Sequence, residues 1–298
     1  MAKVKVFTDS CSDLPQDIRE KNNIGYFRMN VVVAGEEHPA DLDWKEFSPE
    51  QLYAWVGDVK NHCKTTMVPA VEFESKIRET LKEGYDLVYI SCSSKLTGSL
   101  NVFEMVKEDL EKEFPERKII GVDSLCACLG EGFIAYEANK LALAGKSAEE
   151  VVKWVVDNRL KMNQFATVSS LKYLKEAGRV SGASAVFGDL LGIKPILISD
   201  IYGHNVAITK AKGEKKAIRT IVDKTKELID LSISNTVYLG QGMAQEQAAK
   251  VKELLIAELG VNVEEYWIGP IIGTSCGPGV YAVYFWGKEV TFEAEDAK

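Results

Sequence analysis

Apolar and polar positions alternate in blocks up to about residue 160. Short apolar runs predict buried strands, and the longer stretches between them place apolar residues at helical spacing. The predicted strands cover residues 4–7, 28–33, 87–90 and 118–122, and the predicted helices cover 73–82, 98–114, 132–144 and 148–159. A further helix is expected after Asp13-Leu14-Pro15, with Asp13 as its N-cap and Pro15 in its first turn. Strands that alternate with helices predict a parallel sheet covered on both faces.

From about residue 160 the pattern favours a different kind of sheet. Predicted strands at 165–168, 195–198, 206–210, 236–239 and 280–285 include a hairpin around 200–203, and predicted helices cover 215–229 and 245–259. We therefore expect an α/β protein of two domains. Residues 1–160 would form an N-terminal Rossmann-like domain with a parallel sheet. Residues 161–290 would form a C-terminal α/β domain with a mixed or antiparallel sheet, followed by a frayed acidic tail at 291–298.

Composition and charge exclude several classes of protein. The formal net charge of -8 argues against a nucleic-acid-binding protein, which needs a basic face. No run of about 18 apolar residues is present, so we expect no membrane-spanning helix. The chain opens on a strand pattern rather than an apolar signal segment, which predicts a cytoplasmic protein. The 6 cysteines form no C-x-x-C pair and the 3 histidines are scattered, so we expect reduced thiols, no metal site and no cofactor.

The stretch Gly273-Thr274-Ser275-Cys276-Gly277 fits the G-x-S-x-G pattern of a serine hydrolase. In that arrangement a histidine follows the serine and activates it, but no histidine follows Ser275. Pro278 and Gly279 also lead into a predicted strand, where the hydrolase pattern requires a helix. A ligand-facing glycine turn is the favoured interpretation, and a serine hydrolase that uses Ser275 is an alternative.

A second alternative is a nucleotide-binding protein. Gly240-Gln241-Gly242 stands between a predicted strand and a predicted helix and partly matches a dinucleotide fingerprint. The third glycine of that fingerprint is absent, because Gln245 occupies its position. A tight turn from strand to helix accounts for both glycines and is favoured.

Two hydroxyl-rich segments predict an anion site. Residues 91–99 follow a predicted strand, contain five hydroxyl side chains and open a long helix, where backbone N–H groups favour an anion. A second hydroxyl pair, Thr65-Thr66, precedes the helix that starts near Val71. Side chains at the ends of parallel strands converge on one crevice. A bound carboxylate or phosphate is therefore expected there.

Arg179 lies on a predicted polar turn that contains Gly178. A guanidinium group in such a place can reach a ligand, a carboxylate of a partner or a phosphate. An arginine that is simply solvated fits the same pattern.

With these motifs in view, the chain resembles the DegV family of bacterial lipid-binding proteins over nearly all of residues 3–288. The resemblance lies in Thr8-Asp9-Ser10 with Asp13-Leu14-Pro15 (family T-D-S…D-L-P), Thr65-Thr66 (T-S), 93–99 (S-S-x-L-S-G-T), Val122-Asp123-Ser124 (V-D-S), 171–181 with 191–196 (L-x-x-L-x-x-G-G-R-I-S…L-L-x-I-K-P-I) and 272–279 (I-G-T-H-x-G-P-G). Each motif alone is weak, but six in the same order are a specific signal.

The resemblance implies a two-domain fold that holds a long-chain fatty acid between its domains. Studied members are the acyl-carrying subunit of a bacterial fatty acid kinase, in which a separate subunit phosphorylates the bound carboxylate for phospholipid synthesis. By the same resemblance Thr65 and Ser94 would bind the carboxylate, and Arg179 would dock the kinase subunit. The neighbouring hydroxyls that complete the candidate head-group site are those of Ser93, Thr66, Thr274 and Ser275. The implied protein has no catalytic residues of its own.

The chain departs from the family pattern at three positions. Ser275 stands where relatives carry a histidine beside the head group, which removes a titratable donor. Met67 replaces a glutamine that is common after the threonine pair, and Ala177 replaces the first glycine of G-G-R. We expect lipid binding to survive these changes. Either the Ser275 hydroxyl replaces the histidine as a donor or the ligand is held differently, and the missing histidine weakens the case for coupling to a kinase.

Overall fold

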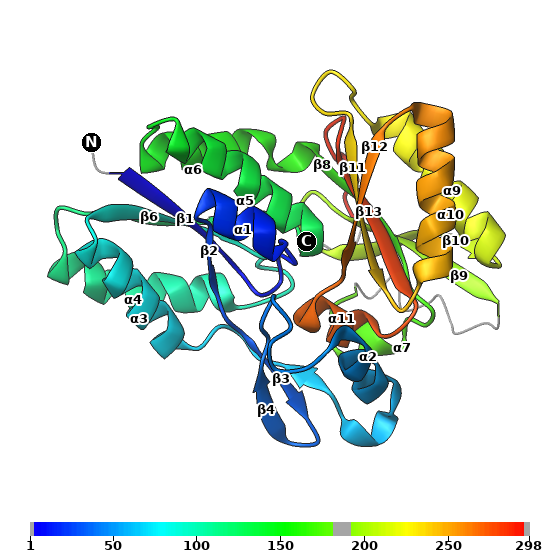
Figure 1. The fold of residues 1–298 in the computed structure, drawn as a ribbon, viewed down its shortest axis with the longest axis horizontal. Helices are drawn as coiled ribbons and strands as arrows, with labels where there is room; N and C mark the ends of the chain where they lie inside the picture. The colour runs from blue at the N-terminus through cyan, green and yellow to red at the C-terminus, as the bar shows by residue number, and fades with distance from the viewer. Residues whose placement is uncertain (1–2, 181–191, 295–298) are drawn as a thin grey trace.

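The protein is described here by a computed structural model, which covers residues 3–180 and 192–294. Two β-sheets lie side by side, each with helices on its outer faces, and a smaller group of elements lies between them (Figure 1). The expected α/β fold with a parallel N-terminal sheet and a mixed C-terminal sheet is confirmed. The boundaries at residues 160 and 290 stay predictions.

The N-terminal sheet is parallel throughout, in the order β2-β1-β6-β7. Its strands are β1 (Lys3–Asp9), β2 (Gly25–Phe27), β6 (Tyr85–Ser91) and β7 (Ile119–Asp123). Helices α3 (Ala70–Lys82) and α4 (Ser99–Glu113) cover one face, and α1 (Gln16–Asn22), α5 (Cys128–Leu143) and α6 (Ala148–Asn158) cover the other (Figure 1). Parallel strands end at a common edge, so the loops after β1, β6 and β7 lie together.

The C-terminal sheet has the order β10-β9-β8-β13-β11-β12, in which only β11 and β12 are parallel. Its strands are β8 (Met162–Thr167), β9 (Ile193–Ser199), β10 (Asn205–Lys212), β11 (Thr236–Gly242), β12 (Asn262–Trp267) and β13 (Val280–Trp286). Helices α9 (Glu214–Leu228) and α10 (Gln245–Leu259) cover its outer face and enclose a separate hydrophobic core. The inner face contributes Ala166, Leu197 and Ala282 to the core of the N-terminal domain.

A third group of short elements fills the space between the two sheets on one side (Figure 1). It contains the sheet β4-β3-β5, made of β3 (Asn30–Val33), β4 (Glu36–Pro39) and β5 (Lys64–Thr65), and the helices α2 (Pro49–Gly57), α7 (Lys172–Glu176) and α11 (Pro270–Cys276). Single 3-10 turns occur at Val59–Asn61 and Arg159–Lys161. Apart from β3, the sequence pattern predicted none of the strands and helices in this group, because short elements show too little periodicity.

Two expectations are wrong, one about the start of α1 and one about the C-terminal tail. Asp13 does not cap α1, which begins at Gln16 after Pro15; Asp13 has a left-handed φ of 49° and a buried carboxyl group. The described part of the C-terminal tail is not frayed, because the Ala294 side chain is buried and the Phe292 carbonyl accepts a hydrogen bond from the Ile201 N–H.

Within the described residues, no helix is long and apolar enough to cross a membrane.

Candidate functional site: a cavity between the two sheets

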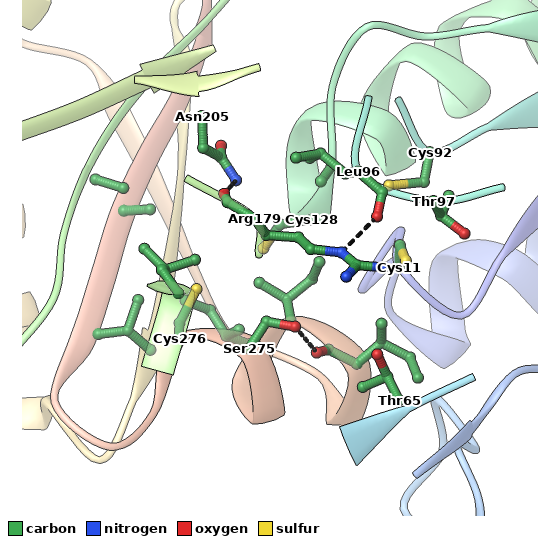
Figure 2. A pocket seen from close by; sticks show the side chains of 18 of the residues that line it. Cys11, Thr65, Cys92, Leu96, Thr97, Cys128, Arg179, Asn205, Ser275 and Cys276 are labelled. Carbon is green, nitrogen blue, oxygen red and sulfur yellow. Dashed lines mark hydrogen bonds between the residues drawn. The ribbon is translucent and has the colours of Figure 1, made fainter. Parts of the chain in front are cut away.

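A cavity with a volume of about 400 Å³ lies between the edge of the N-terminal sheet and the inner face of the C-terminal sheet. Its walls come from β5, from the loops after β1, β6 and β7, from β8, β9 and β13, and from α7 and α11. Most of the lining side chains are apolar, and a few hydroxyl, amide and guanidinium groups interrupt them (Figure 2). This size and character suit a largely apolar small molecule with few polar atoms.

Three threonine hydroxyls gather on the N-terminal side of the cavity. Thr65 reaches it from β5, Thr66 directly follows β5, and Thr97 reaches it from the loop before α4. The Thr66 hydroxyl donates to the Met67 carbonyl at 3.0 Å, and that of Thr97 lies 2.9 Å from the Ser99 hydroxyl. Within the described residues the Thr65 hydroxyl makes no hydrogen bond, so it is available to a ligand. Sequence reasoning missed Thr97, although it belongs to the hydroxyl-rich segment singled out there.

Ser93 and Ser94 are placed differently from what the resemblance implies. Neither is among the described residues that line the cavity. The Ser93 hydroxyl is fully buried and donates to the Gly203 carbonyl at 2.9 Å, which joins the N-terminal domain to the β9–β10 hairpin. Ser94 is exposed, and its N–H donates to the Asp123 carboxylate at 3.1 Å. The loop thus aims Thr97, and not its two serines, at the cavity.

The predicted glycine turn at Ser275 is mostly a helix. Pro270 at the first helical position starts α11, and only Gly277 to Gly279 form a turn. Within α11, the hydroxyls of Thr274 and Ser275 donate to the carbonyls four residues earlier, at 2.7 and 3.2 Å. Ser275 lines the cavity (Figure 2). Thr274 is buried and faces a neighbouring cavity.

Within the described residues no general base is hydrogen-bonded to Ser275, although His62 borders the neighbouring cavity that Ser275 also lines. In the described parts of the chain its hydroxyl bonds only to the Ile271 carbonyl. His204 pairs with the Asp200 carboxylate at 3.2 Å, and the His38 ring stacks on Trp55. This geometry gives the hydrolase alternative no support.

The glycines of the second alternative do not form a turn between strand and helix. Gly240 and Gly242 are residues of β11, which continues to Gly242, and α10 begins only at Gln245. A Cβ atom on Gly240 would lie 3.0 Å from the Ile268 side chain, and one on Gly242 would collide with the Tyr53 ring. Both glycines are therefore explained by close packing across the inner face of the sheet, which was not foreseen.

Arg179 crosses the cavity from the C-terminal side. Its Nε donates to the Leu96 carbonyl at 2.8 Å, and its own carbonyl accepts from the Asn205 amide at 3.2 Å (Figure 2). The exposed guanidinium group also borders a second cavity of about 470 Å³, which shares Thr65 and Ser275 with the first. Part of the family motif that follows, at 181–191, lies outside the described residues.

Buried carboxyl groups lie behind the N-terminal wall of the cavity. Asp9 accepts hydrogen bonds from the Tyr89 hydroxyl at 2.6 Å and from two backbone N–H groups, but burial still raises its pKa. Burial likewise raises the pKa of Glu131 well above its usual range, although Thr8 donates to one oxygen. Burial raises the pKa of Asp13 to about 7, and neither of its oxygens has a hydrogen bond of ordinary geometry. Burial therefore shifts all three carboxyl groups toward the neutral form.

Four of the six free cysteines line the cavity: Cys11, Cys92, Cys128 and Cys276. Burial raises the pKa of Cys276 to about 12, and that of Cys128 is also raised well above its usual range by burial. Their thiols are protonated at neutral pH and act as small apolar groups in the wall. Among the described residues, no group of three or more His, Cys, Asp or Glu side chains is arranged to hold a metal ion.

Relatives with known structures share this whole architecture. A structure described as fatty acid binding of a DegV family protein from Thermus thermophilus matches with a TM-score of 0.84 and 27% identity, covering 96% of this chain and 100% of the other. The structure of DegV, a fatty acid binding protein from Bacillus subtilis, matches with a TM-score of 0.82 and 26% identity, covering 97% and 100%.

Sequence comparison agrees with the structural one. A DegV domain-containing protein of Clostridium perfringens is 31% identical over 288 residues, which is 96% of this chain and 98% of that protein. The model of the DegV family of uncharacterised proteins matches residues 3–288, nearly the whole chain. The six ordered motifs, the two sheets and these matches agree, and the chain belongs to the DegV family.

Proposed function

We propose that this protein binds one long-chain fatty acid in the cavity between its sheets, with no catalysis of its own. The observation that carries the proposal is the lining itself: a mostly apolar wall and, at one side, the Thr65 hydroxyl, which makes no hydrogen bond to any described residue. An acyl chain requires an apolar wall, and a carboxylate requires a hydrogen-bond donor such as the Thr65 hydroxyl. The fatty acids named for the DegV relatives from Thermus thermophilus and Bacillus subtilis support the same ligand class.

We place the carboxylate among the hydroxyls of Thr65, Thr66, Thr97 and Ser275. Thr97 takes the role that the resemblance gave to Ser94, since Thr97 faces the cavity and Ser94 is exposed. Neutral donors are sufficient because the acyl chain supplies most of the affinity. A chain of about 16 carbons buries roughly 15 apolar groups at about 0.8 kcal/mol each, an upper bound near 12 kcal/mol. Losses on association reduce this to micromolar or nanomolar binding.

We further propose that the carboxylate is presented to a separate fatty acid kinase for acyl-phosphate formation, in the cytoplasm and for phospholipid synthesis. The second cavity gives such a partner access, because it opens beside Thr65 and Ser275. Arg179 and Lys64 border it and offer positive charge to an incoming phosphoryl group. Thr65 lies at the junction of both cavities, where an acyl carboxylate would meet that partner.

Ligand extraction followed by mass spectrometry tests the binding proposal. We expect fatty acid in organic extracts of the purified protein and uptake of added palmitate after delipidation. Thr65→Val removes the free hydroxyl at nearly constant shape and should weaken palmitate binding about tenfold or more, because a hydrogen bond to a charged group contributes about 1.5–3 kcal/mol. Thr220→Val on α9, remote from the cavity, is the matched control. Clean extracts together with no palmitate uptake would refute the proposal.

A further inference from the structure

The inner face of the C-terminal sheet changes from apolar to polar along the cavity. Ala282, Ala166 and Leu197 lie opposite one another on β13, β8 and β9 and form an apolar row. Two residues before Ala166 on β8, a second row carries polar side chains instead. Its members are Tyr284 paired with Gln164, and Ser199 paired with Asn205. Because side chains alternate between faces, both rows contribute to the same cavity wall.

The polar row is incompletely satisfied by its own hydrogen bonds. The Gln164 side chain is 9% exposed, and its Nε2 donates to the side-chain Oδ1 of Asn205 at 3.4 Å. Its Oε1 accepts from the Ser199 hydroxyl at 3.5 Å. Both contacts are at the outer limit for a hydrogen bond, so the amide keeps unused donor and acceptor capacity. A buried amide in an apolar cavity is costly unless a partner reaches it.

The polar row lies far from the hydroxyls that we assign to the carboxylate. The end of β8 lies near α11. Thr167 pairs with Tyr281 near the start of β13, and β13 follows α11 in the chain. Val168, the next residue after Thr167, therefore also lies near α11. Gln164 is four residues back along the strand, which is about 13 Å at 3.3 Å per residue. Figure 2 agrees, with Asn205 on the opposite side of the cavity from Thr65 and Arg179 between them. A bound acyl chain would pass the apolar row first and the polar row later.

We propose that this cavity selects a fatty acid with a hydroxyl group in the half of its chain remote from the carboxylate, bound by Gln164 and Asn205. The proposal rests on the proposed fatty-acid binding and names a narrower ligand class for it. The hydroxyl would donate to the Gln164 carbonyl oxygen and accept from an amide N–H. A site with buried hydrogen-bonding groups discriminates against an analogue that lacks the hydroxyl, because its polar groups are then left without a good partner.

Competition binding with stearate and stearates hydroxylated at successive carbons tests the proposal. For the full chain we expect at least one isomer with a remote hydroxyl to bind about fivefold or more tightly than stearate. Gln164→Leu should reduce the ratio of the two affinities to about one. Asn205→Ala, at a half-buried position, should reduce the preference and gives a second variant if Gln164→Leu folds poorly. Gln245→Leu, exposed on α10, is the matched control.

The outcomes separate this proposal from the one on which it rests. Equal binding of stearate and all hydroxylated isomers would overturn the hydroxyl selection but leave fatty-acid binding intact. An equal loss of affinity for every ligand in Gln164→Leu would also overturn it, because the carboxylate would then lie at the polar row. Failure of the wild-type protein to bind any of these acids would instead refute the proposed function.

Discussion

Replacing Asp13 by asparagine should stabilise the protein, and more so at alkaline pH. The Asp13 carboxyl is buried between the domains, against Gly269 and the Cys128 thiol. Among the described groups that act on its ionisation none is a cation, and the Asp9 carboxyl nearby opposes its charge. Asparagine keeps the shape, removes the charge and tolerates the left-handed φ of 49° at this position.

The size of the effect follows from the pKa of Asp13, which burial raises from 3.8 to about 7. The folded state binds the proton more tightly than the unfolded state. Stability from this group is therefore complete below about pH 4 and is lost as the pH rises to 7. The full loss is about 4 kcal/mol at roughly 1.4 kcal/mol per pKa unit, of which about 2 kcal/mol is already lost at pH 5. The variant should thus gain about 2–3 kcal/mol more over wild type at pH 8 than at pH 5.

Urea denaturation of both proteins at pH 5 and pH 8 measures this double difference in the free energy of unfolding. The comparison between variant and wild type cancels the contributions of Asp9 and Glu131, which also titrate abnormally. Asp17→Asn, at an exposed carboxylate on α1, controls for the simple loss of a negative charge. If Asp13→Asn changes stability equally at the two pH values, or destabilises more at pH 8, then Asp13 is not an unpaired buried carboxyl.

Three further predictions concern the cavity. Ala166→Phe should fill the space over the apolar row and reduce palmitate uptake about tenfold or more, with an unchanged circular dichroism spectrum; normal uptake would show that the acyl chain lies elsewhere. Bound palmitate should slow the labelling of Cys11 and Cys92 by N-ethylmaleimide, measured by peptide mass spectrometry, while the labelling of Cys63, which lies outside this cavity, stays constant. If palmitate leaves the labelling rates of all three cysteines unchanged, the placement of the ligand is contradicted. A fluorophosphonate probe should label neither wild type nor Ser275→Ala, and labelling lost only in the variant would revive the hydrolase alternative.

The main layers of the fold were predictable because each long element shows its own period. α3, α4, α9 and α10 bury one stripe of side chains, and strands such as β13 are continuous apolar runs. The elements between the sheets were not predictable in the same way. β5 has two residues and α11 has seven, and both are held by contacts with distant parts of the chain.

The residue types of the candidate site were predictable from the sequence, but their arrangement in space was less so. The sequence placed hydroxyl clusters near Thr65 and at 91–99, and the cavity does receive Thr65, Thr66 and Thr97. The residue of a loop that faces the cavity is determined by the local turn and by burial. The pattern of apolar positions in the sequence reveals neither. Ser93 illustrates this, since its hydroxyl is committed to the Gly203 carbonyl of the other domain.

The loop between β6 and α4 performs two tasks with neighbouring residues. Through Ser93 and the Leu96 carbonyl it is bonded to the hairpin and to Arg179 of the C-terminal half, and through Thr97 it faces the cavity. Separating the two halves at this side would therefore displace Thr97 from the cavity. Under the proposed function, one movement would part the two halves and release the fatty acid, and a partner that moves Arg179 would weaken the hydrogen bonds to its carboxylate.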